Sequence, residues 1–171
     1  SYKSIALAEK YDMIYATAGY HPHESKFSQK GYLKELENLL SHNKVVALGE
    51  IGLDYYYNNS NPKIQRRVFE EQLDLASSLN IPVIIHNRMA DKDILNSLVN
   101  KKINKGVIHC FASNLDFAKN IISLNIHLSF TGLITFSNDL ENVIKNISIN
   151  NIMLETDSPY LTPVPNRGKR N

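Results

Sequence analysis

The sequence has little cysteine, little net charge and no long apolar run, and each shortage excludes a class of protein. Cys110 is the only cysteine, which excludes an internal disulfide and a cysteine-ligated zinc site and predicts a reducing, cytoplasmic compartment. The net charge of +2 is too small to indicate a general polyanion binder, so any contact with nucleic acid would be local. No apolar stretch reaches the roughly 18 residues of a membrane-spanning helix, and none resembles a signal peptide.

What the chain does contain is the composition of one globular domain, since 43% of its 171 residues are hydrophobic and 21% are charged. Six short apolar runs rich in Ile and Val alternate with amphipathic segments. Continuous apolar runs are typical of strands that are buried on both faces of a parallel sheet. The predicted strands are Ile14–Tyr20, Val45–Ile51, Ile81–His86, Gly106–Cys110, Ile126–Phe130 and Ile152–Glu155.

Helical periodicity fills the intervals between these strands. The longest predicted helix has Asn61 as its N-cap and Pro62 as its first helical residue, and its apolar residues recur along one face. We also expect Ser137 to cap the last helix. Other apolar stripes lie in residues 3–11, 32–40, 117–122 and 140–147.

Strict alternation of helices and strands predicts an α/β protein with a parallel sheet and right-handed crossovers. An open doubly wound sheet and a (β/α)8 barrel are both compatible with it. The barrel needs eight strands and about 250 residues. Residues 1–171 would therefore form a single partial domain, which lacks the first two β/α units and the last helix of a barrel.

Ionisable side chains follow the carboxyl ends of five of the six predicted strands. In parallel α/β folds, ligands bind at that edge. Imidazole and carboxylate groups ligate divalent metals, so the pattern predicts an open catalytic metal site. A carboxylate there can bridge two cations, which together activate water for displacement at a phosphodiester. The residues are His21, His23, Glu24, Glu50, Asp54, His86, Arg88, His109, Glu155 and Asp157.

A structural role is the alternative for each of these residues, because a lone strand histidine is usually a hydrogen-bonded core residue. We keep that interpretation for His42 and His127. Metal ligation is favoured for four residues, since a buried cluster of such groups without compensating charge is costly. These four are Glu50, His86, His109 and Asp157.

Three further interpretations concern neighbours of the predicted ligands. Asp54 is expected to cap a loop, and Glu155 is expected to be structural, with a role behind a metal ligand as the alternative. Residues 55–57 are three consecutive tyrosines. They could offer a surface on which bases stack, although packing within the loop is the favoured interpretation.

Six motifs, taken in order, give the chain its resemblance to a known family. The motifs GYHPHE (19–24), ALGEIGLDYY (47–56), PVIIHNR (82–88), GVIHCF (106–111), LSFTG (128–132) and LETDSPYL (154–161) resemble those of the TatD family of metal-dependent deoxyribonucleases. The resemblance implies a (β/α)8 barrel of the amidohydrolase type. It also implies hydrolysis of DNA phosphodiesters, often as a 3′→5′ exonuclease, with two divalent cations that could be Mg, Mn or Zn.

The same resemblance implies a role for each matched residue. Glu50 resembles the glutamate that bridges the metals, and His86 and His109 resemble ligands of the second metal. Asp157 resembles the aspartate that binds metal and orients or deprotonates the attacking water. Three residues are implied in substrate binding, namely His21, His23 and Arg88, and the arginine suits a phosphate because of its fork of donors.

The chain also departs from the family pattern. It has no Asp-x-His-x-His segment for the first metal, and Met89 stands where an acidic residue is usual. We therefore expect a fragment of marginal stability, because absent strands expose sheet edges. The alternatives to a deoxyribonuclease are a small-molecule metallohydrolase built on the same barrel and a catalytically inactive metal-binding fragment.

Overall fold

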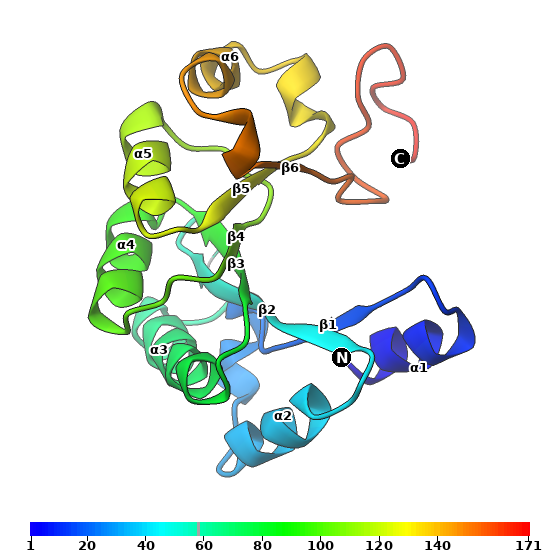
Figure 1. Ribbon diagram of the computed structural model, residues 1–171, viewed down its shortest axis with the longest axis vertical. Coiled ribbons are helices and arrows are strands. Elements are labelled where there is room, and N and C mark those ends of the chain that lie inside the picture. The colour runs from blue at the N-terminus through cyan, green and yellow to red at the C-terminus, as the bar shows by residue number, and fades with distance from the viewer. Residues whose placement is uncertain (58) are drawn as a thin grey trace. The chain divides into compact units, whose positions relative to one another are not determined.

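The computed structural model describes residues 1–57 and 59–171, which form two compact units, Ser1–Gly106 and Val107–Asn171. Helices and strands alternate along the chain in both units (Figure 1). The first unit contains α1 (Tyr2–Lys10), β1 (Ala16–Ala18), the 3-10 helix η1 (Pro22–Phe27), α2 (Tyr32–Leu40), β2 (Val45–Asp54), α3 (Pro62–Leu79), β3 (Val83–Arg88) and α4 (Asp91–Asn100).

The second unit begins one residue into β4 (Gly106–Ile108). It continues with α5 (Leu115–Ser123), β5 (His127–Phe130), η2 (Gly132–Thr135), α6 (Asn138–Lys145), η3 (Ile149–Asn151) and β6 (Ile152–Leu154). In each unit the strands pair in parallel and in chain order, β1–β2–β3 in the first and β4–β5–β6 in the second. The predicted α/β class with six parallel strands is confirmed, and closure into a barrel stays a prediction.

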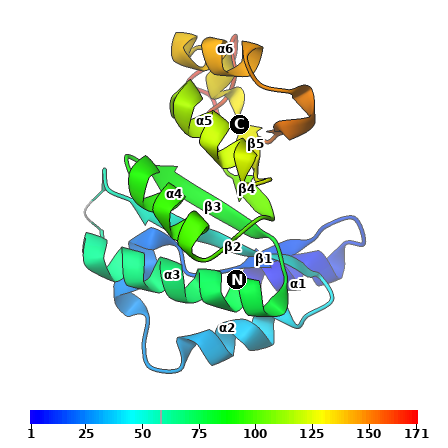
Figure 2. The same ribbon diagram turned by 60° about the vertical axis from the view of Figure 1, so that its left-hand side comes forward.

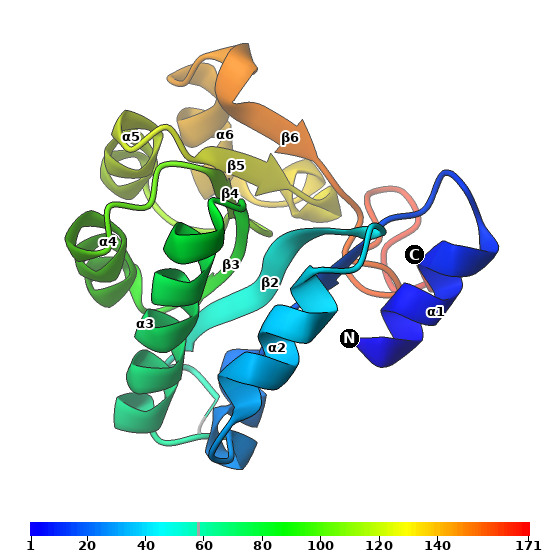
Figure 3. The same cartoon turned by 60° about the horizontal axis from the view of Figure 1, so that its bottom comes forward.

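Helices pack against the strands within each unit. In the first unit α3 and α4 contact β2 (Figure 2), and α2 lies beside α3 (Figure 3). The fully buried side chains between them are aliphatic or aromatic, so the core forms where the helical stripes meet the apolar runs. They include Leu48, Ile51, Leu53, Phe69, Leu73, Ile85, Ile94 and Leu98.

The second unit has a smaller core, centred on aromatic rings. Phe111 lies with its ring centroid 6.1 Å from that of Phe117 and 5.8 Å from that of Phe130. Ile121 of α5 and Leu128 of β5 are fully buried. None of the helices in the described residues combines the length and the apolar character that a bilayer span requires.

The start of α3 confirms the predicted cap. The Asn61 side chain accepts a hydrogen bond from the backbone N–H of Lys63, and Pro62 is the first helical residue. Ser137 does occupy the N-cap position of α6, but its side chain makes no capping hydrogen bond. The expected capping interaction of Ser137 is therefore wrong.

The strand predictions differ from the structure in several places. β3 starts and ends two residues later than predicted, so His86 lies inside it, and β4 ends at Ile108, so His109 follows it. β1 ends at Ala18, so His21 is the N-cap of η1 and not a strand-end residue. β2 runs on to Asp54, because it pairs with β3 as far as Arg88. β6 is not buried on both faces, since Met153 and Leu154 are 49% and 78% exposed.

Candidate metal centre

The end of β3 places one histidine between two carboxylates. His86 Nδ1 lies 2.9 Å from Glu50 Oε1, and His86 Nε2 lies 3.0 Å from Asp54 Oδ2. Both carboxylates belong to β2, whose Gly52 pairs with His86. We call His86, Glu50 and Asp54 the β3 histidine group. Its carboxylates differ in environment, because the Asp54 side chain is 1% exposed and that of Glu50 is 32% exposed.

The two contacts of His86 fit a bound cation. Carboxylate oxygens only accept, and a neutral imidazole has one N–H, so it can donate to only one of the two carboxylates. With the proton on Nε2, shared with buried Asp54, the lone pair of Nδ1 faces Glu50. A divalent cation bound there by Nδ1 and Oε1 would satisfy the second contact, with the carboxylate behind the histidine fixing its tautomer.

His21 completes a set of three possible ligands. One ligand atom from each of His21, Glu50 and His86 lies within 4.8 Å of the other two. The Nδ1 atom of His21, however, accepts a hydrogen bond from the backbone N–H of His23 at 3.2 Å. A neutral His21 therefore carries its proton on Nε2, which lies 3.6 Å from Glu50 Oε1, so His21 fits a hydrogen-bond donor better than a metal ligand.

Asp54 caps the loop that follows β2, as predicted, and it also accepts hydrogen bonds from two histidines. Oδ1 accepts the backbone N–H groups of Tyr56 and Tyr57, which confirms the cap, and Oδ2 accepts from His23 and His86. Burial acts to raise the pKa of Asp54, but these hydrogen bonds outweigh it and lower the pKa. The carboxylate thus stays ionised behind both histidines. Only the spacing from Glu50 to Asp54, which puts both on one strand face, could have indicated this role.

Two buried glutamines of α3 hold the main chain around this group. Gln72 accepts from the backbone N–H of Tyr20 at 2.7 Å and donates to its carbonyl at 3.1 Å. Gln65 accepts from the N–H of Asp54 and donates to its carbonyl, both at 2.9 Å. Ser60 adds a hydrogen bond to the carbonyl of His23. The apolar pattern of the sequence did not identify Gln65 or Gln72, although both are completely buried.

Gly52 permits the close approach of β2 to β3 at this point. Its φ is 143°, and a Cβ atom there would lie 2.0 Å from the carbonyl oxygen of His86. A side chain at residue 52 would therefore push apart the two strands that carry Glu50 and His86.

The end of β4 repeats the arrangement inside the second unit. His109 Nδ1 lies 2.6 Å from Glu155 Oε2, and His109 Nε2 lies 3.8 Å from Asp157 Oδ1. We call these three residues the β4 histidine group. Here Nδ1–H donates to the inner carboxylate, so Nε2 is the nitrogen on the side of Asp157. Asp157 has a φ of 56°, in the left-handed region, which is uncommon for a residue with a side chain and occurs often at functional sites.

Glu155 acts behind His109, which was the alternative interpretation of this residue. Its Oε1 accepts from the backbone N–H of Cys110 at 2.7 Å and from the hydroxyl of Ser129. Burial acts to raise the pKa of Glu155, but hydrogen bonds from His109, Ser129 and Cys110 outweigh it and lower the pKa. These contacts fit the structural interpretation of Glu155 as well, and its role behind a metal ligand stays a prediction.

The remaining predicted residues lie as follows. His23 shares Asp54 with His86, and its side chain is 26% exposed. Arg88 pairs in register with Asp54 at the end of β3. His42 makes a surface contact with Glu9 at 3.1 Å, and neither residue belongs to a histidine group. The convergence of Glu50, His86, His109 and Asp157 on shared cations stays a prediction, because these residues belong to different units.

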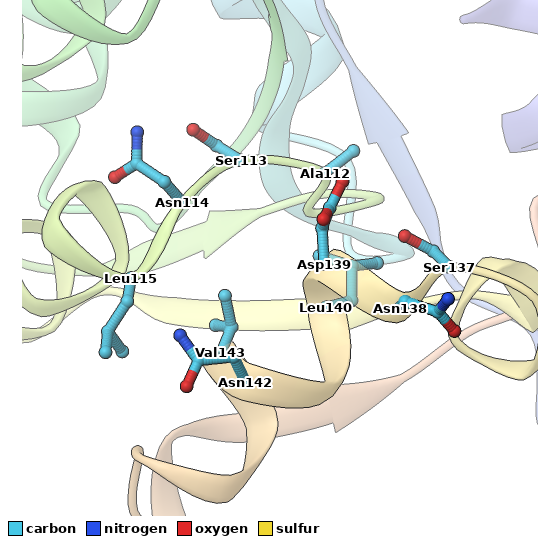
Figure 4. Close-up of a pocket in the computed structure, with 10 residues that line it drawn as sticks. All are labelled: Ala112, Ser113, Asn114, Leu115, Ser137, Asn138, Asp139, Leu140, Asn142 and Val143. Carbon is cyan, nitrogen blue, oxygen red and sulfur yellow. The ribbon is translucent and has the colours of Figure 1, made fainter.

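The second unit also contains a polar pocket of about 520 Å³ at the N-terminal ends of α5 and α6 (Figure 4). Asn114, Ser137 and Asp139 contribute to its lining, and none of the predicted site residues does. The pocket is therefore distinct from the β4 histidine group.

Strand-end histidines held by carboxylates on parallel α/β strands are typical of metal-dependent hydrolases, and comparison with known proteins places the chain in that class. Residues 1–171 match the TatD related DNase family, and the chain belongs to that family. The resemblance seen in the six motifs is confirmed.

Individual relatives support the same family. The chain is 40% identical over 173 residues to the uncharacterized metal-dependent hydrolase YabD of Bacillus subtilis, covering 99% of this chain and 68% of YabD. It is 36% identical to YcfH of Escherichia coli K12, covering 96% of this chain and 63% of YcfH.

Two crystal structures share the fold. The TatD homologue YJJV of Escherichia coli K12 superposes with a TM-score of 0.92 at 31% identity, over 99% of this chain and 68% of that one. The TatD family hydrolase of Entamoeba histolytica has a TM-score of 0.83 at 32% identity, over 94% of this chain and 57% of that one. The chain thus spans about two thirds or less of the length of these relatives.

Proposed function

We propose that this protein hydrolyses DNA phosphodiester bonds with divalent metal ions, as a deoxyribonuclease that acts from the 3′ end. The observation that carries the proposal is the pair of strand-end histidines, each with one ring nitrogen against an inner carboxylate and the other facing a more exposed one. Membership of the TatD related DNase family supports the same chemistry.

Glu50, His86, His109 and Asp157 are the proposed metal ligands, and two cations of Mg, Mn or Zn type fit imidazole and carboxylate donors. When bound, such cations would lower the pKa of a coordinated water and offset charge on the phosphoryl oxygens. The side chains of Glu50 and Asp157 are 32% and 35% exposed. Each carboxylate is therefore accessible to solvent and substrate.

The protein's own groups supply the remaining functions. Asp157 is the proposed acceptor for the proton of the attacking water, and Glu50 orients that water. His21 presents Nε2–H as a donor to a phosphate oxygen, because its Nδ1 is occupied by the backbone N–H of His23. His23 and Arg88 are proposed to hold the substrate, with the guanidinium as a planar phosphate partner.

The experiment is a nuclease assay on end-labelled single-stranded DNA with Mg, Mn or Zn, comparing Glu50→Ala and Asp157→Ala with the parent protein. Each variant should lose at least about a hundredfold in turnover, the scale on which removal of one electrostatic stabiliser acts. Asp139→Ala, an acidic residue of the second unit outside both histidine groups, should retain activity.

Undiminished turnover in either ligand variant would overturn the assignment. Turnover of a dihydropyrimidine or a lactone with none on DNA would instead identify a small-molecule hydrolase. Bound metal without any turnover would identify a catalytically inactive metal-binding protein.

A further inference from the structure

Two exposed tyrosines and an arginine form a cluster beside the β3 histidine group. The guanidinium carbon of Arg88 lies 4.4 Å from the ring centroid of Tyr56 and 4.8 Å from that of Tyr57. The two rings meet edge to face, with centroids 4.8 Å apart. Tyr56 is 55% exposed and Tyr57 45% exposed, so about half of each side chain faces solvent, although Tyr57 also meets the His23 ring edge to face at 5.6 Å. We call the three residues the Tyr56–Tyr57–Arg88 cluster.

The guanidinium of Arg88 has N–H donors available for a ligand. Within residues 1–57 and 59–171, its guanidinium contacts the two aromatic rings and makes no hydrogen bond or ion pair. A cation–π contact uses none of the N–H donors of a guanidinium, so they remain available to a ligand. Arg88 is thus oriented by its neighbours while its hydrogen-bonding capacity remains open to a ligand.

Asp54 fixes this cluster relative to the β3 histidine group. One of its oxygens accepts from His86, and the other accepts from the backbone N–H groups of Tyr56 and Tyr57. The backbone N–H of Tyr55 donates to the carbonyl of Arg88 at 2.9 Å. A ligand held by the cluster would therefore sit at a fixed place beside the candidate metal ligands.

Tyr55 is packed, unlike Tyr56 and Tyr57. Exposure is therefore not a property that all three consecutive tyrosines share. Its hydroxyl donates to Asp93 at 2.7 Å, so Tyr55 packs within the fold, as expected from the sequence. Tyr56 and Tyr57 instead present their rings to solvent on the side of Arg88.

We propose that the Tyr56–Tyr57–Arg88 cluster is a subsite for one nucleotide unit of a single-stranded substrate. Arg88 donates to the phosphate, and the base stacks on an aromatic ring or on the guanidinium plane. Single strands are the class of substrate that fits, since a base inside a duplex has both faces covered by its neighbours. This subsite deepens the proposed function and rests on it for the identity of the substrate.

Binding can be measured without hydrolysis. A tetranucleotide containing 2-aminopurine is titrated with the whole protein in EDTA, and quenching of the probe reports stacking. Tyr56→Ala and Tyr57→Ala should each weaken binding about tenfold and reduce the quenching. Tyr56→Phe and Tyr57→Phe should bind as the parent protein does, because the ring and not the hydroxyl carries the contact.

Two comparisons separate stacking from charge. Arg88→Lys keeps the charge but loses the fork, and should weaken binding of the probe and of an abasic tetranucleotide alike. Tyr56→Ala should weaken binding of the probe but not of the abasic strand. Tyr15→Ala, which removes a ring of the first unit that is 59% exposed and lies 5.0 Å from Lys44 Nζ, is the matched control and should change neither.

The subsite proposal fails if both alanine variants bind the probe as tightly as the parent protein, or if the abasic strand binds as well as the probe. Cleavage of DNA at the parental rate with both rings removed would also refute the subsite, while leaving the proposed function intact. Quenching that depends on Tyr56 in a protein without nuclease activity supports the subsite and counts against the proposed function.

Discussion

The β3 and β4 histidine groups each contain a histidine, an inner carboxylate and an outer carboxylate. The two histidines turn different ring nitrogens toward the inner carboxylate. His86 directs Nε2 to the inner carboxylate, Asp54, and Nδ1 to the outer one, Glu50. His109 directs Nδ1 to the inner carboxylate, Glu155. The nitrogen that faces the outer carboxylate is therefore set by the position of the inner carboxylate and not by the histidine itself.

The two groups also differ in how their main chain is held. In the first unit, Gln65 donates to and accepts from the backbone of Asp54, so a helix supports the strand end. In the second unit the inner carboxylate does this itself, because Glu155 accepts from the backbone N–H of Cys110. In the β3 histidine group a helix side chain thus supports the buried carboxylate, and in the β4 histidine group the carboxylate bonds directly to the backbone beside its histidine.

Substitution of the inner carboxylates should separate the two groups most strongly. Asp54→Asn should lower metal affinity about 10- to 100-fold and the unfolding free energy by about 3 kcal/mol, because two histidines lose a buried charged acceptor. Glu155→Gln should lower metal affinity by a similar factor but stability by only about 1 kcal/mol, since its side chain is 22% exposed. Calorimetric metal titration and urea denaturation measure the two quantities.

The position of the proton on each imidazole ring can be measured directly in Asp54→Asn and Glu155→Gln. Nitrogen-15 spectra of the metal-free protein should show the proton of neutral His86 on Nε2 and that of neutral His109 on Nδ1. Asp54→Asn should alter His23 and His86 but not His109, and Glu155→Gln should alter His109 but not the other two. The exposed carboxylates Asp74 and Glu141 provide matched controls as Asp74→Asn and Glu141→Gln. Identical proton positions in the two histidines would refute the assignment of opposite ring nitrogens.

The buried glutamines test the difference in main-chain support. Gln72→Met leaves the N–H and carbonyl of Tyr20 without their partner and should cost about 2 kcal/mol of unfolding free energy. It should also weaken metal binding at the β3 histidine group, because Tyr20 precedes His21, whose Nε2 lies 3.6 Å from Oε1 of the proposed ligand Glu50. Leu73→Met, at a fully buried neighbour, should cost under about 1.5 kcal/mol and leave metal affinity unchanged. Equal metal affinities in Gln72→Met and the parent would show that Gln72 only stabilises the fold.

The smallest expected effect is a change in the unfolding free energy of the first unit at alkaline pH. Burial, together with a hydrogen bond to the carboxylate of Glu71 and its negative charge, raises the pKa of the Tyr32 phenol. The unfolded chain loses this proton near pH 10, so the contribution to stability is complete below pH 10 and is lost as pH rises toward the raised pKa.

Tyr32→Phe should therefore flatten the fall in unfolding free energy above pH 10, measured by urea denaturation across that range. Tyr15→Phe, at a ring that is 59% exposed, is the control and should leave the slope unchanged. A parental slope in Tyr32→Phe would show that the phenol does not ionise differently in the two states.

Much of the fold could be predicted, because the spacing of apolar residues and the capping of helices depend only on residues that are close in the sequence. The α3 helix, with Asn61 and Pro62 at its start, lies as predicted. The ends of β1, β2, β3 and β4 did not follow from the apolar runs, because pairing with a neighbouring strand decides where a strand stops. Among the site residues, the contact of Glu50 with His86 was anticipated, while Gln65 and Gln72 were not, since a buried glutamine on an apolar helix face has no signature in the sequence.

The sequence by itself determined the family, the six strands and the residue types at their ends, because these depend on composition, periodicity and the order of motifs. Only the tertiary structure decided which nitrogen of each histidine faces which carboxylate, that Asp54 and Glu155 stand behind the histidines, and that Arg88 lies over two tyrosine rings. Hydrogen bonds and ring contacts between distant residues depend on directions in space, and a linear pattern contains no such directions.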